Sequence, residues 1–380
     1  MRILLLSAYD ADSHKYWRQG LQKYLPEHHW TVLTLPPRHF SWRIRGNSLS
    51  WAFQEQESLQ QDYDLLLASS MVDLSALRGF VPKLCSIPTL LYFHENQFAF
   101  PQNASQHASV EPQIVNLYGA LCADRLCFNS AFNRDTFLQG ASNLLRRLPD
   151  EVPEGLVERL QIKAQVLPVP LFPCSDGLVL ESELKTQWRD SHWLLPGSVE
   201  PMLRIVWNAR HEYDKGPKQL LALVQALEAR GVSFKIAVLG QQFRRSPEEF
   251  GTLKNQFSHR LAWFGYLNSA IEYRQCLASA HCVLSTALHE FQGLAVLEAI
   301  AEGCIPVLPN RLAYPEYVGS QYLYESRVDE QEEASSAVEL LLQVRSLPLP
   351  SVSSFSWPAL KVSYEEAFQL TLNTHQHAKL

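Results

Sequence analysis

The chain has 380 residues, enough for two or three domains, and its 46% apolar and 19% charged residues are typical of a folded globular protein. No apolar stretch reaches the roughly 20 residues that span a bilayer, and the apolar start is soon broken by Ser7, Asp10 and Asp12, so we expect neither a membrane span nor a secretory signal. Seven cysteines without a CxxC pair indicate a reducing, cytoplasmic location, and a net charge of −6 disfavours a nucleic-acid partner without excluding a local basic patch.

The first half of the chain alternates short apolar segments with amphipathic ones. Strands are predicted at Arg2–Ala8, Trp30–Leu35, Tyr63–Ser69, Thr89–Phe93 and Arg125–Asn129, and helices at Tyr16–Tyr24, Ile114–Ala123 and Asn133–Leu138. This alternation is typical of a parallel sheet that is buried on both faces. We therefore predict a first Rossmann-like domain over residues 1–173.

The first two candidate stretches of this half lie near its beginning. The loop after the first strand carries Ser13 and His14, which are candidates for contact with a ligand at the carboxyl edge of the sheet. The segment Arg38–Arg45 mixes cations with aromatic rings, a pattern that suits phosphate contacts together with base stacking. Its candidate contact residues are Arg38, Trp42, Arg43 and Arg45. The alternative is an ordinary basic surface loop.

A polar string follows the strand Thr89–Phe93. It consists of His94, Glu95, Asn96 and Gln97. Burying a histidine, a carboxylate and two amides costs free energy unless each finds a partner, so the string indicates either a functional site or a hydrogen-bonded core loop.

A proline cluster separates the two halves. Residues 174–201 follow it without a clear period and are the predicted linker. Strands are then predicted at Leu203–Asn208, Phe234–Gly240, Ala262–Gly265, Cys282–Ala287 and Ile305–Leu308, and helices at Pro217–Arg230, Ile271–Ser279 and Leu294–Glu302. We predict a second Rossmann-like domain over residues 202–350, followed at 351–380 by a C-terminal helix (Trp357–Leu372) and tail. Two such doubly wound domains are expected to face a cleft.

The most specific motif of the chain runs from Glu290 to Glu298, between a strand and a helix. Gly293 and Leu294 lie at the predicted start of the helix, where free backbone amides and the helix dipole favour an anion such as a phosphate. Glu298, one turn into the helix, is placed to accept hydrogen bonds from a ribose diol, and Glu290 is placed to meet a sugar. Two solvent-facing glutamates are the alternative.

Two cations follow the first strand of the second half. Arg210 and Lys215 lie in the loop before a helix, and such a pair suits a diphosphate, although ordinary surface charges have the same pattern. Gly240 ends the next strand and permits close approach of the backbone to a nucleotide.

Together these motifs resemble family 4 of the retaining glycosyltransferases, which have the GT-B fold and use a nucleotide-diphosphate sugar. The resemblance covers both halves of the chain. It implies that Arg210 and Lys215 bind the diphosphate, that Glu290 and His94 lie near the sugar, and that Glu298 binds the ribose. It also implies catalysis without a metal or another cofactor, because positive side chains and helix amides stabilise the leaving diphosphate.

A narrower resemblance rests on Ser13 to Lys15, the Arg38–Arg45 segment, His94 to Gln97 and the segment from Phe128 to Asn133. These stretches are similar to the tRNA-queuosine α-mannosyltransferases. The similarity implies transfer of mannose from GDP-mannose to queuosine in the anticodon of aspartate tRNA. It requires that the Arg38–Arg45 segment and other basic residues gather on one rim; these are Arg146, Arg147, Arg244 and Arg245.

Three alternatives stay open at this point. The same donor site fits an enzyme that acts on a lipid, glycan or small-molecule acceptor, and the fold also fits a sugar-nucleotide epimerase. A third alternative is a nucleotide-sugar-binding protein without catalysis. Because Lys215 is expected to act in the transition state, we expect Lys215→Ala to lose turnover with little loss of fold.

Overall fold

The computed structural model describes residues 1–99, 109–172, 188–193, 202–242 and 246–378, which form two compact units. The first unit combines Met1–Pro170 with Trp357–Leu380, and the second is Leu171–Ser356. Each unit contains one six-stranded parallel sheet. Among the described residues, no helix is both long enough and apolar enough to cross a membrane.

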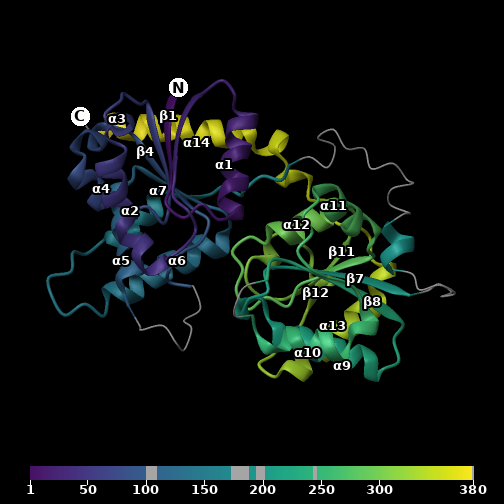
Figure 1. Ribbon diagram of the computed structural model, residues 1–380. Coiled ribbons are helices and arrows are strands. Elements are labelled where there is room, and N and C mark those ends of the chain that lie inside the picture. Colours follow the sequence, from purple (N-terminus) through teal and green to yellow (C-terminus); the bar gives the residue numbers. More distant parts are fainter. Residues whose placement is uncertain (100–108, 173–187, 194–201, 243–245, 379–380) are drawn as a thin grey trace. The chain divides into compact units, whose positions relative to one another are not determined.

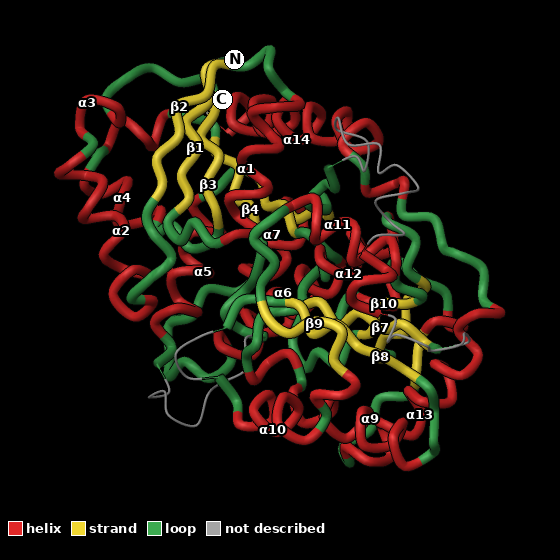
Figure 2. The backbone as a smooth tube through the Cα atoms, turned by 45° about the vertical axis from the view of Figure 1, so that its right-hand side comes forward, coloured by secondary structure: helices red, strands yellow, loops and turns green. Residues whose placement is uncertain are grey.

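The sheet of the first unit has the strand order β2-β1-β3-β4-β5-β6. Its strands, drawn in yellow in Figure 2, are β1 (Arg2–Ser7), β2 (His29–Thr34), β3 (Leu65–Ser69), β4 (Thr89–Phe93), β5 (Arg125–Phe128) and β6 (Ala164–Val166). The chain leaves β1 toward β2 and then returns to the other side of β1 to form β3. The carboxyl ends of β1 and β3 are therefore a topological switch point, where sheets of this kind bind ligands.

Helices cover both faces of this sheet (Figure 1). One face packs against α2 (Phe40–Gln54), α4 (Leu74–Phe80), α5 (Glu111–Cys122), α6 (Ala131–Leu145) and α7 (Leu156–Lys163) through an apolar core. The short helix α3 (Gln56–Leu59) follows α2. The other face carries α1 (Asp12–Tyr24), where Trp17 stacks on Tyr92 with ring centroids 4.4 Å apart. Burial on both faces explains why the strands are continuous apolar runs.

The last helix of the chain, α14 (Trp357–Ala378), returns to the first unit and lies beside α1 and β4 (Figure 1). Trp17 Nε1 donates to Tyr364 Oη at 3.0 Å, and His28 pairs with Glu365 at 3.0 Å. Near the end of the helix, His375 Nδ1 lies 3.1 Å from Asp124. These contacts make the C-terminal helix an integral layer of the first unit.

The sheet of the second unit has the strand order β12-β11-β10-β7-β8-β9. Its strands are β7 (Leu203–Asn208), β8 (Phe234–Leu239), β9 (Leu261–Gly265), β10 (Cys282–Leu284), β11 (Ile305–Pro309) and β12 (Leu323–Tyr324). Helices α11 (Ala270–Ser279) and α12 (Leu294–Ala301) cover one face. The other face is covered by α9 (Pro217–Ala229), α10 (Glu248–Gln256) and α13 (Glu330–Gln343).

Several elements differ from the sequence prediction. Ser13 and His14 lie in the first turn of α1 rather than in a loop, because the helix begins at Asp12. The basic segment Arg38–Arg45 runs into α2, a helix that was not predicted from the sequence. Helices α3, α4, α7, α10 and α13 and strands β6 and β12 were not predicted either, and strand β10 ends three residues earlier than predicted.

Candidate functional site

The motifs of the second unit meet at the topological switch point of its sheet. Strands β7 and β10 are neighbours in the sheet although β8 and β9 separate them in the chain. The loop after β7 carries Arg210 and Lys215, and the loop after β10 carries Glu290 and Gly293. Because both strands are parallel, the two loops leave the same edge of the sheet and are brought side by side.

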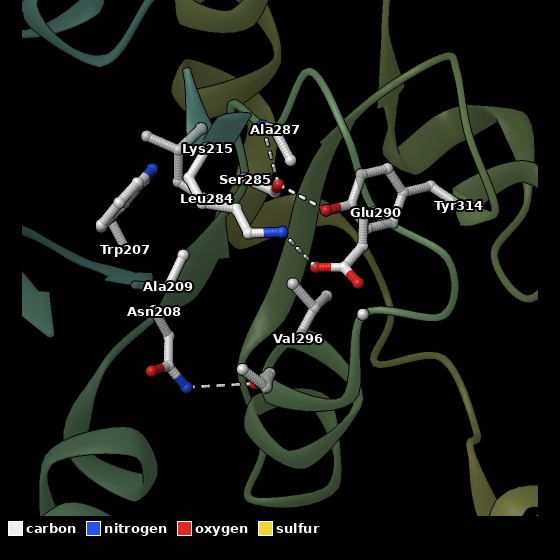
Figure 3. A pocket seen from close by; sticks show the side chains of 12 residues that line it. Trp207, Asn208, Ala209, Lys215, Leu284, Ser285, Ala287, Glu290, Val296 and Tyr314 are labelled. Atoms are coloured by element: carbon white, nitrogen blue, oxygen red, sulfur yellow. Dashed lines mark hydrogen bonds and ion pairs between the residues drawn. The ribbon is translucent and has the colours of Figure 1, made fainter. Parts of the chain in front are cut away.

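Lys215 is the centre of this edge. Its side chain is 9% exposed, and its ammonium donates to the carbonyl of His289 at 2.8 Å. The same nitrogen lies 3.2 Å from Glu290 Oε2 and 3.2 Å from Asp214 Oδ2. Figure 3 shows the ammonium pointing at the Glu290 carboxylate across the pocket. The predicted sugar glutamate and the predicted phosphate lysine are therefore in direct contact.

These contacts determine the ionisation states of Lys215 and Glu290. Burial acts to lower the pKa of Lys215, but the carboxylates of Glu290 and Asp214 outweigh it and the pKa is raised. Burial likewise acts to raise the pKa of Glu290, but the charge and hydrogen bond of Lys215 outweigh it and the pKa is lowered. Both groups are thus ionised at neutral pH, as an ion pair that shares a small, partly enclosed site.

Arg210 lies at the solvent side of the same loop. Its side chain is 51% exposed, and its guanidinium contacts Glu212 at 2.8 Å and Asp214 at 3.9 Å. The fork is therefore anchored at the mouth of the site while half of its surface faces water, a geometry that suits a diphosphate arriving from solvent.

The helix α12 begins at this edge after Gly293, whose φ is 78°. A Cβ atom there would lie 2.9 Å from Tyr317 Oη and 3.1 Å from Tyr314 Cε1, so both backbone conformation and space favour glycine. The amides of Leu294 and Ala295 open the helix and, by position, have no intrahelical acceptor. A pocket lined by Asn208, Lys215, Glu290, Gly293, Ala295 and Tyr314, among others, lies in front of this helix start (Figure 3).

Two further predicted donor residues have defined surroundings. Glu298 accepts a hydrogen bond from Tyr273 Oη at 2.8 Å. Gly240 has a φ of 142°, and a Cβ atom there would lie 1.8 Å from the carbonyl oxygen of Ala209. The nucleotide contact that we predicted at Gly240 stays a prediction; in the structure, the group that approaches this glycine is the loop leading to Arg210.

In the first unit, two histidines meet at the carboxyl edge of the sheet. His14 from α1 stacks on His94, which follows β4, with ring centroids 4.1 Å apart and an interplanar angle of 26°. Trp17 abuts His94 edge-on at 4.8 Å. Both imidazoles are buried, and His94 Nε2 and both ring nitrogens of His14 have no hydrogen-bond partner. Unpaired buried polar atoms are uncommon in folded proteins, so this edge of the sheet is a candidate for a ligand site.

The environment of His94 keeps its ring neutral. Burial, and secondarily the neighbouring His14, hold the pKa of His94 well below its usual value. Glu95 lies beside the pair, with Oε2 3.6 Å from His14 Nε2. A neutral imidazole both donates and accepts hydrogen bonds, so His94 is suited to hold a sugar hydroxyl.

The next two residues of the string support the loop itself. Asn96 is fully buried; its amide donates to Asn133 and Thr136, and its oxygen accepts from the backbone amides of Phe98 and Ala99. The backbone amide of Gln97 donates to Asn116 Oδ1 at 2.8 Å. For Asn96 the hydrogen-bonded core loop, which the sequence left open as an alternative, describes the contacts in the structure.

The basic segment occupies the N-terminal end of α2. Trp42 is 54% exposed and lies over Gly46, where a Cβ atom would meet its ring. Arg45 is half exposed and pairs with Asp73 at 2.6 Å and Glu111 at 3.3 Å, whereas Arg43 is buried. Arg38 is exposed.

The other predicted basic residues are less informative. Arg146 donates to Ser142 and Asn143 at the end of α6. Arg147 is exposed, and Arg244 and Arg245 lie outside the described residues.

Three residues of the second site were missed in the sequence. Asp214 is 3% exposed and pairs with Lys215, and its place between the two predicted cations was a usable signal. Asn208 ends β7 and donates a hydrogen bond to Tyr273 on α11, and Tyr273 in turn donates one to Glu298. No spacing rule connects Tyr273 with Glu298, because the two residues come from different helices.

Each half of the chain matches the model of a known protein family. A family model described as tRNA-queuosine alpha-mannosyltransferase N-terminal matches residues 2–171, and one described as glycosyl transferases group 1 matches residues 200–349. The tRNA-queuosine alpha-mannosyltransferase of Drosophila melanogaster is 31% identical over 334 residues, which covers 85% of this chain and 83% of that protein.

Solved structures resemble the chain over its length. A sucrose-phosphate synthase from Thermosynechococcus elongatus has a TM-score of 0.65 at 14% identity and covers 97% of this chain, which covers 98% of that structure. A glycosyltransferase from Rickettsia africae has a TM-score of 0.64 at 14% identity, with 98% of each chain covered. The catalytic domain of starch synthase IV from Arabidopsis thaliana has a TM-score of 0.62 at 14% identity, with 98% and 99% covered. Identities this low show the fold alone, and they confirm the predicted α/β architecture of two Rossmann-like domains, the GT-B fold.

Proposed function

The chain belongs to the tRNA-queuosine alpha-mannosyltransferase family, and from that premise we propose that it transfers mannose from GDP-mannose to queuosine in the anticodon of aspartate tRNA. It is a glycosyltransferase by both family matches. The donor, the acceptor tRNA and the retention of configuration at the transferred sugar belong to the proposal.

One observation carries the donor half of the proposal: Lys215, Arg210 and the start of α12 lie together at the switch point of the second sheet. A buried ammonium, an exposed guanidinium fork and helix amides are the groups that bind a diphosphate. In this scheme Gly293 and Leu294 place the amides, Gly240 admits the loop of Arg210, Glu290 meets the hexose and Glu298 accepts the ribose hydroxyls. No resident cofactor is proposed, because these groups supply the positive charge.

The acceptor half rests on the first unit. His94 offers a neutral, buried imidazole whose Nε2 lacks a partner, and its stacking partner His14 and the neighbouring Glu95 fix its surroundings. Ser13 and Gln97 flank this edge. Trp42 and Arg38 are the exposed aromatic and cationic groups of the basic segment, and they suit stacking on a base and contact with a phosphate. Arg43 and Arg45 complete the proposed acceptor contacts at that end of α2, where Arg45 also pairs with Asp73 and Glu111.

The proposed step retains the configuration at the anomeric carbon of the sugar. An acceptor hydroxyl oxygen bonds to the anomeric carbon as the bond from that carbon to the β-phosphate oxygen breaks. The hydroxyl proton passes to a phosphate oxygen, so GDP leaves and no protein nucleophile is consumed. Arg210 and Lys215 stabilise the charge that develops on the diphosphate, and this is where they contribute to rate. Glu290 and His94 orient the hexose.

A tRNA acceptor also leads us to propose a cytoplasmic location, as the cysteine content predicts.

The proposal is tested by a transfer assay. Purified protein is incubated with aspartate tRNA that carries or lacks queuosine, in parallel with GDP-mannose, UDP-glucose and UDP-galactose. The tRNA is then digested and its nucleosides are weighed by mass spectrometry. We expect a hexose on queuosine only, and with GDP-mannose only.

The other outcomes separate the alternatives. Slow hydrolysis of a donor without transfer to tRNA would retain the glycosyltransferase but replace the acceptor by a lipid, glycan or small molecule. Binding of a nucleotide sugar with neither transfer nor hydrolysis would contradict catalysis and favour a binding protein.

A further inference from the structure

A chain of two hydrogen bonds leads to Glu298 from outside its own helix. Asn208 Nδ2 lies 2.7 Å from Tyr273 Oη, and Tyr273 Oη lies 2.8 Å from Glu298 Oε2. An amide nitrogen only donates, so Asn208 must give its proton to the phenol oxygen. The one proton of Tyr273 is then directed to the carboxylate, and the chain has a single polarity.

This chain joins three separate elements. Asn208 ends β7, Tyr273 lies on α11 and Glu298 lies on α12. The Asn208 amide also donates to the carbonyl of Ala295 in the first turn of α12, at 3.2 Å, as Figure 3 shows. Glu298 is therefore held both through its own helix and through a neighbouring one, at a fixed distance from the helix start.

A free glutamate side chain rotates about three bonds, and a ligand that binds it must first pay the entropy of fixing those rotations. A hydrogen bond to one carboxylate oxygen removes much of that rotation before the ligand arrives. Each carboxylate oxygen accepts more than one hydrogen bond, so the contact with Tyr273 does not use up the group.

We propose that Tyr273 is a positioning residue for donor specificity: it holds the Glu298 carboxylate in the orientation that accepts the two ribose hydroxyls of the nucleotide sugar. The inference rests on the proposed function, because it takes Glu298 as the ribose ligand. Asn208 is the anchor that sets the direction of the Tyr273 hydroxyl.

The test compares GDP-mannose with its 2′-deoxyribose analogue in the full-length enzyme. Tyr273→Phe keeps the ring and removes only the hydroxyl. We expect KM for GDP-mannose to rise about five- to tenfold, the effect of one lost hydrogen bond, while kcat stays within about twofold. We expect KM for the 2′-deoxy donor, which keeps only the 3′-hydroxyl as a partner for Glu298, to rise by a smaller factor, so the discrimination between the two donors falls.

Two further variants make the result specific. Tyr322→Phe also removes one tyrosine hydrogen bond, that to the carbonyl of Pro348 at 2.7 Å, and is expected to leave the discrimination unchanged. In a Glu298→Gln background, Tyr273→Phe should change the discrimination by less than about twofold, since coupled residues do not add.

A merely structural role for Tyr273 predicts a different pattern. Equal weakening of both donors by Tyr273→Phe, or an unchanged ratio with a lower melting temperature, would overturn the inference. Failure of the unsubstituted enzyme to use GDP-mannose at all would instead overturn the proposed function.

Discussion

The carboxyl edges of the two sheets are built from different chemistry. In the second unit, Lys215 is surrounded by Glu290, Asp214 and a backbone carbonyl, so its positive charge is paired with two carboxylates. In the first unit, His14 and His94 are held by ring stacking and leave imidazole nitrogens unpaired. On the proposed function, we therefore expect the second edge to recognise a ligand by its charge, and the first edge to recognise one by shape and neutral hydrogen bonds.

The largest effect is expected from the exposed cation of the second edge. Arg210→Ala should lower kcat/KM for the donor by about 2–4 kcal/mol in transition-state stabilisation, roughly 30- to 1000-fold, because the developing phosphate charge loses a donor. The melting temperature should change little, since half of the side chain faces water. Arg230→Ala, which removes a surface arginine paired with Glu339, is the matched control. An Arg210 variant with normal kcat/KM would contradict the claim that the charged edge of the second unit binds the donor diphosphate.

Lys215→Ala is the less clean variant, contrary to the expectation from the sequence. Removing the ammonium would take away the nearer ion-pair partner of the buried Asp214 carboxylate and leave it only the longer contact with Arg210 at 3.9 Å, and loss of a buried partner typically costs several kcal/mol. We therefore expect loss of fold stability together with loss of turnover.

The close packing of the second edge is tested at Gly240. Gly240→Ala places a Cβ atom on the carbonyl of Ala209 and should lower the free energy of unfolding by about 3 kcal/mol. The reason is that the clash is between backbone segments, and neither segment can move aside without losing other contacts. Chemical denaturation measures the change. Gly251→Ala is the control: it lies in α10 with open space around it and should be neutral or slightly stabilising. Equal stability of the two variants would contradict the packing.

The neutral edge of the first unit is tested by His94→Phe. A phenylalanine ring can still stack between His14 and Trp17, but the hydrogen bonds proposed between the imidazole and the sugar are lost, so turnover should fall roughly ten- to a hundredfold. Steady-state transfer to tRNA measures this, and His29→Phe, an exposed position in the same unit, serves as the control. Full activity of His94→Phe would remove the first edge from the proposed site.

The smallest effect concerns a buried histidine of the second unit. His211 is stacked on Phe250 at 4.3 Å, and burial lowers its pKa to about 4. The unfolded chain takes up the proton near pH 6.5, so this contribution to stability is complete above that pH and is lost as the pH falls toward 4.

Comparison of wild type with His211→Phe at pH 7 and pH 5 measures this contribution. At pH 5 the wild type should have lost about 1–2 kcal/mol more than the variant. A parallel decline of both proteins would contradict the assignment.

The sequence predicts most of the sheet strands because they are continuous apolar runs, and β4 and β7 have the predicted bounds. The Glu290–Glu298 motif and the Arg210–Lys215 loop could be connected because parallel strands bring their following loops to one edge. Helix α2 was missed because its apolar periodicity is weak: Trp42, Leu49 and Phe53 are exposed.

Contacts between distant side chains could not be predicted. No spacing in the sequence indicates that Lys215 is buried against Glu290, or that Tyr273 contacts Glu298 from another helix. Asn96 illustrates the opposite error, in which a residue predicted to be functional has a structural role. A polar residue in a suggestive motif satisfies its own hydrogen bonds inside the loop, and only the structure reveals this.

The division of labour between the two units is tested most directly by a crossed binding measurement. The affinities for GDP-mannose and for queuosine-containing aspartate tRNA would be measured by calorimetry for Arg210→Ala and for the double variant Arg38→Ala, Trp42→Ala. We predict that Arg210→Ala weakens only GDP-mannose binding, and that the double variant weakens only tRNA binding, by about tenfold or more. Loss of tRNA affinity in Arg210→Ala with GDP-mannose binding intact, or the reverse in the double variant, would contradict the account.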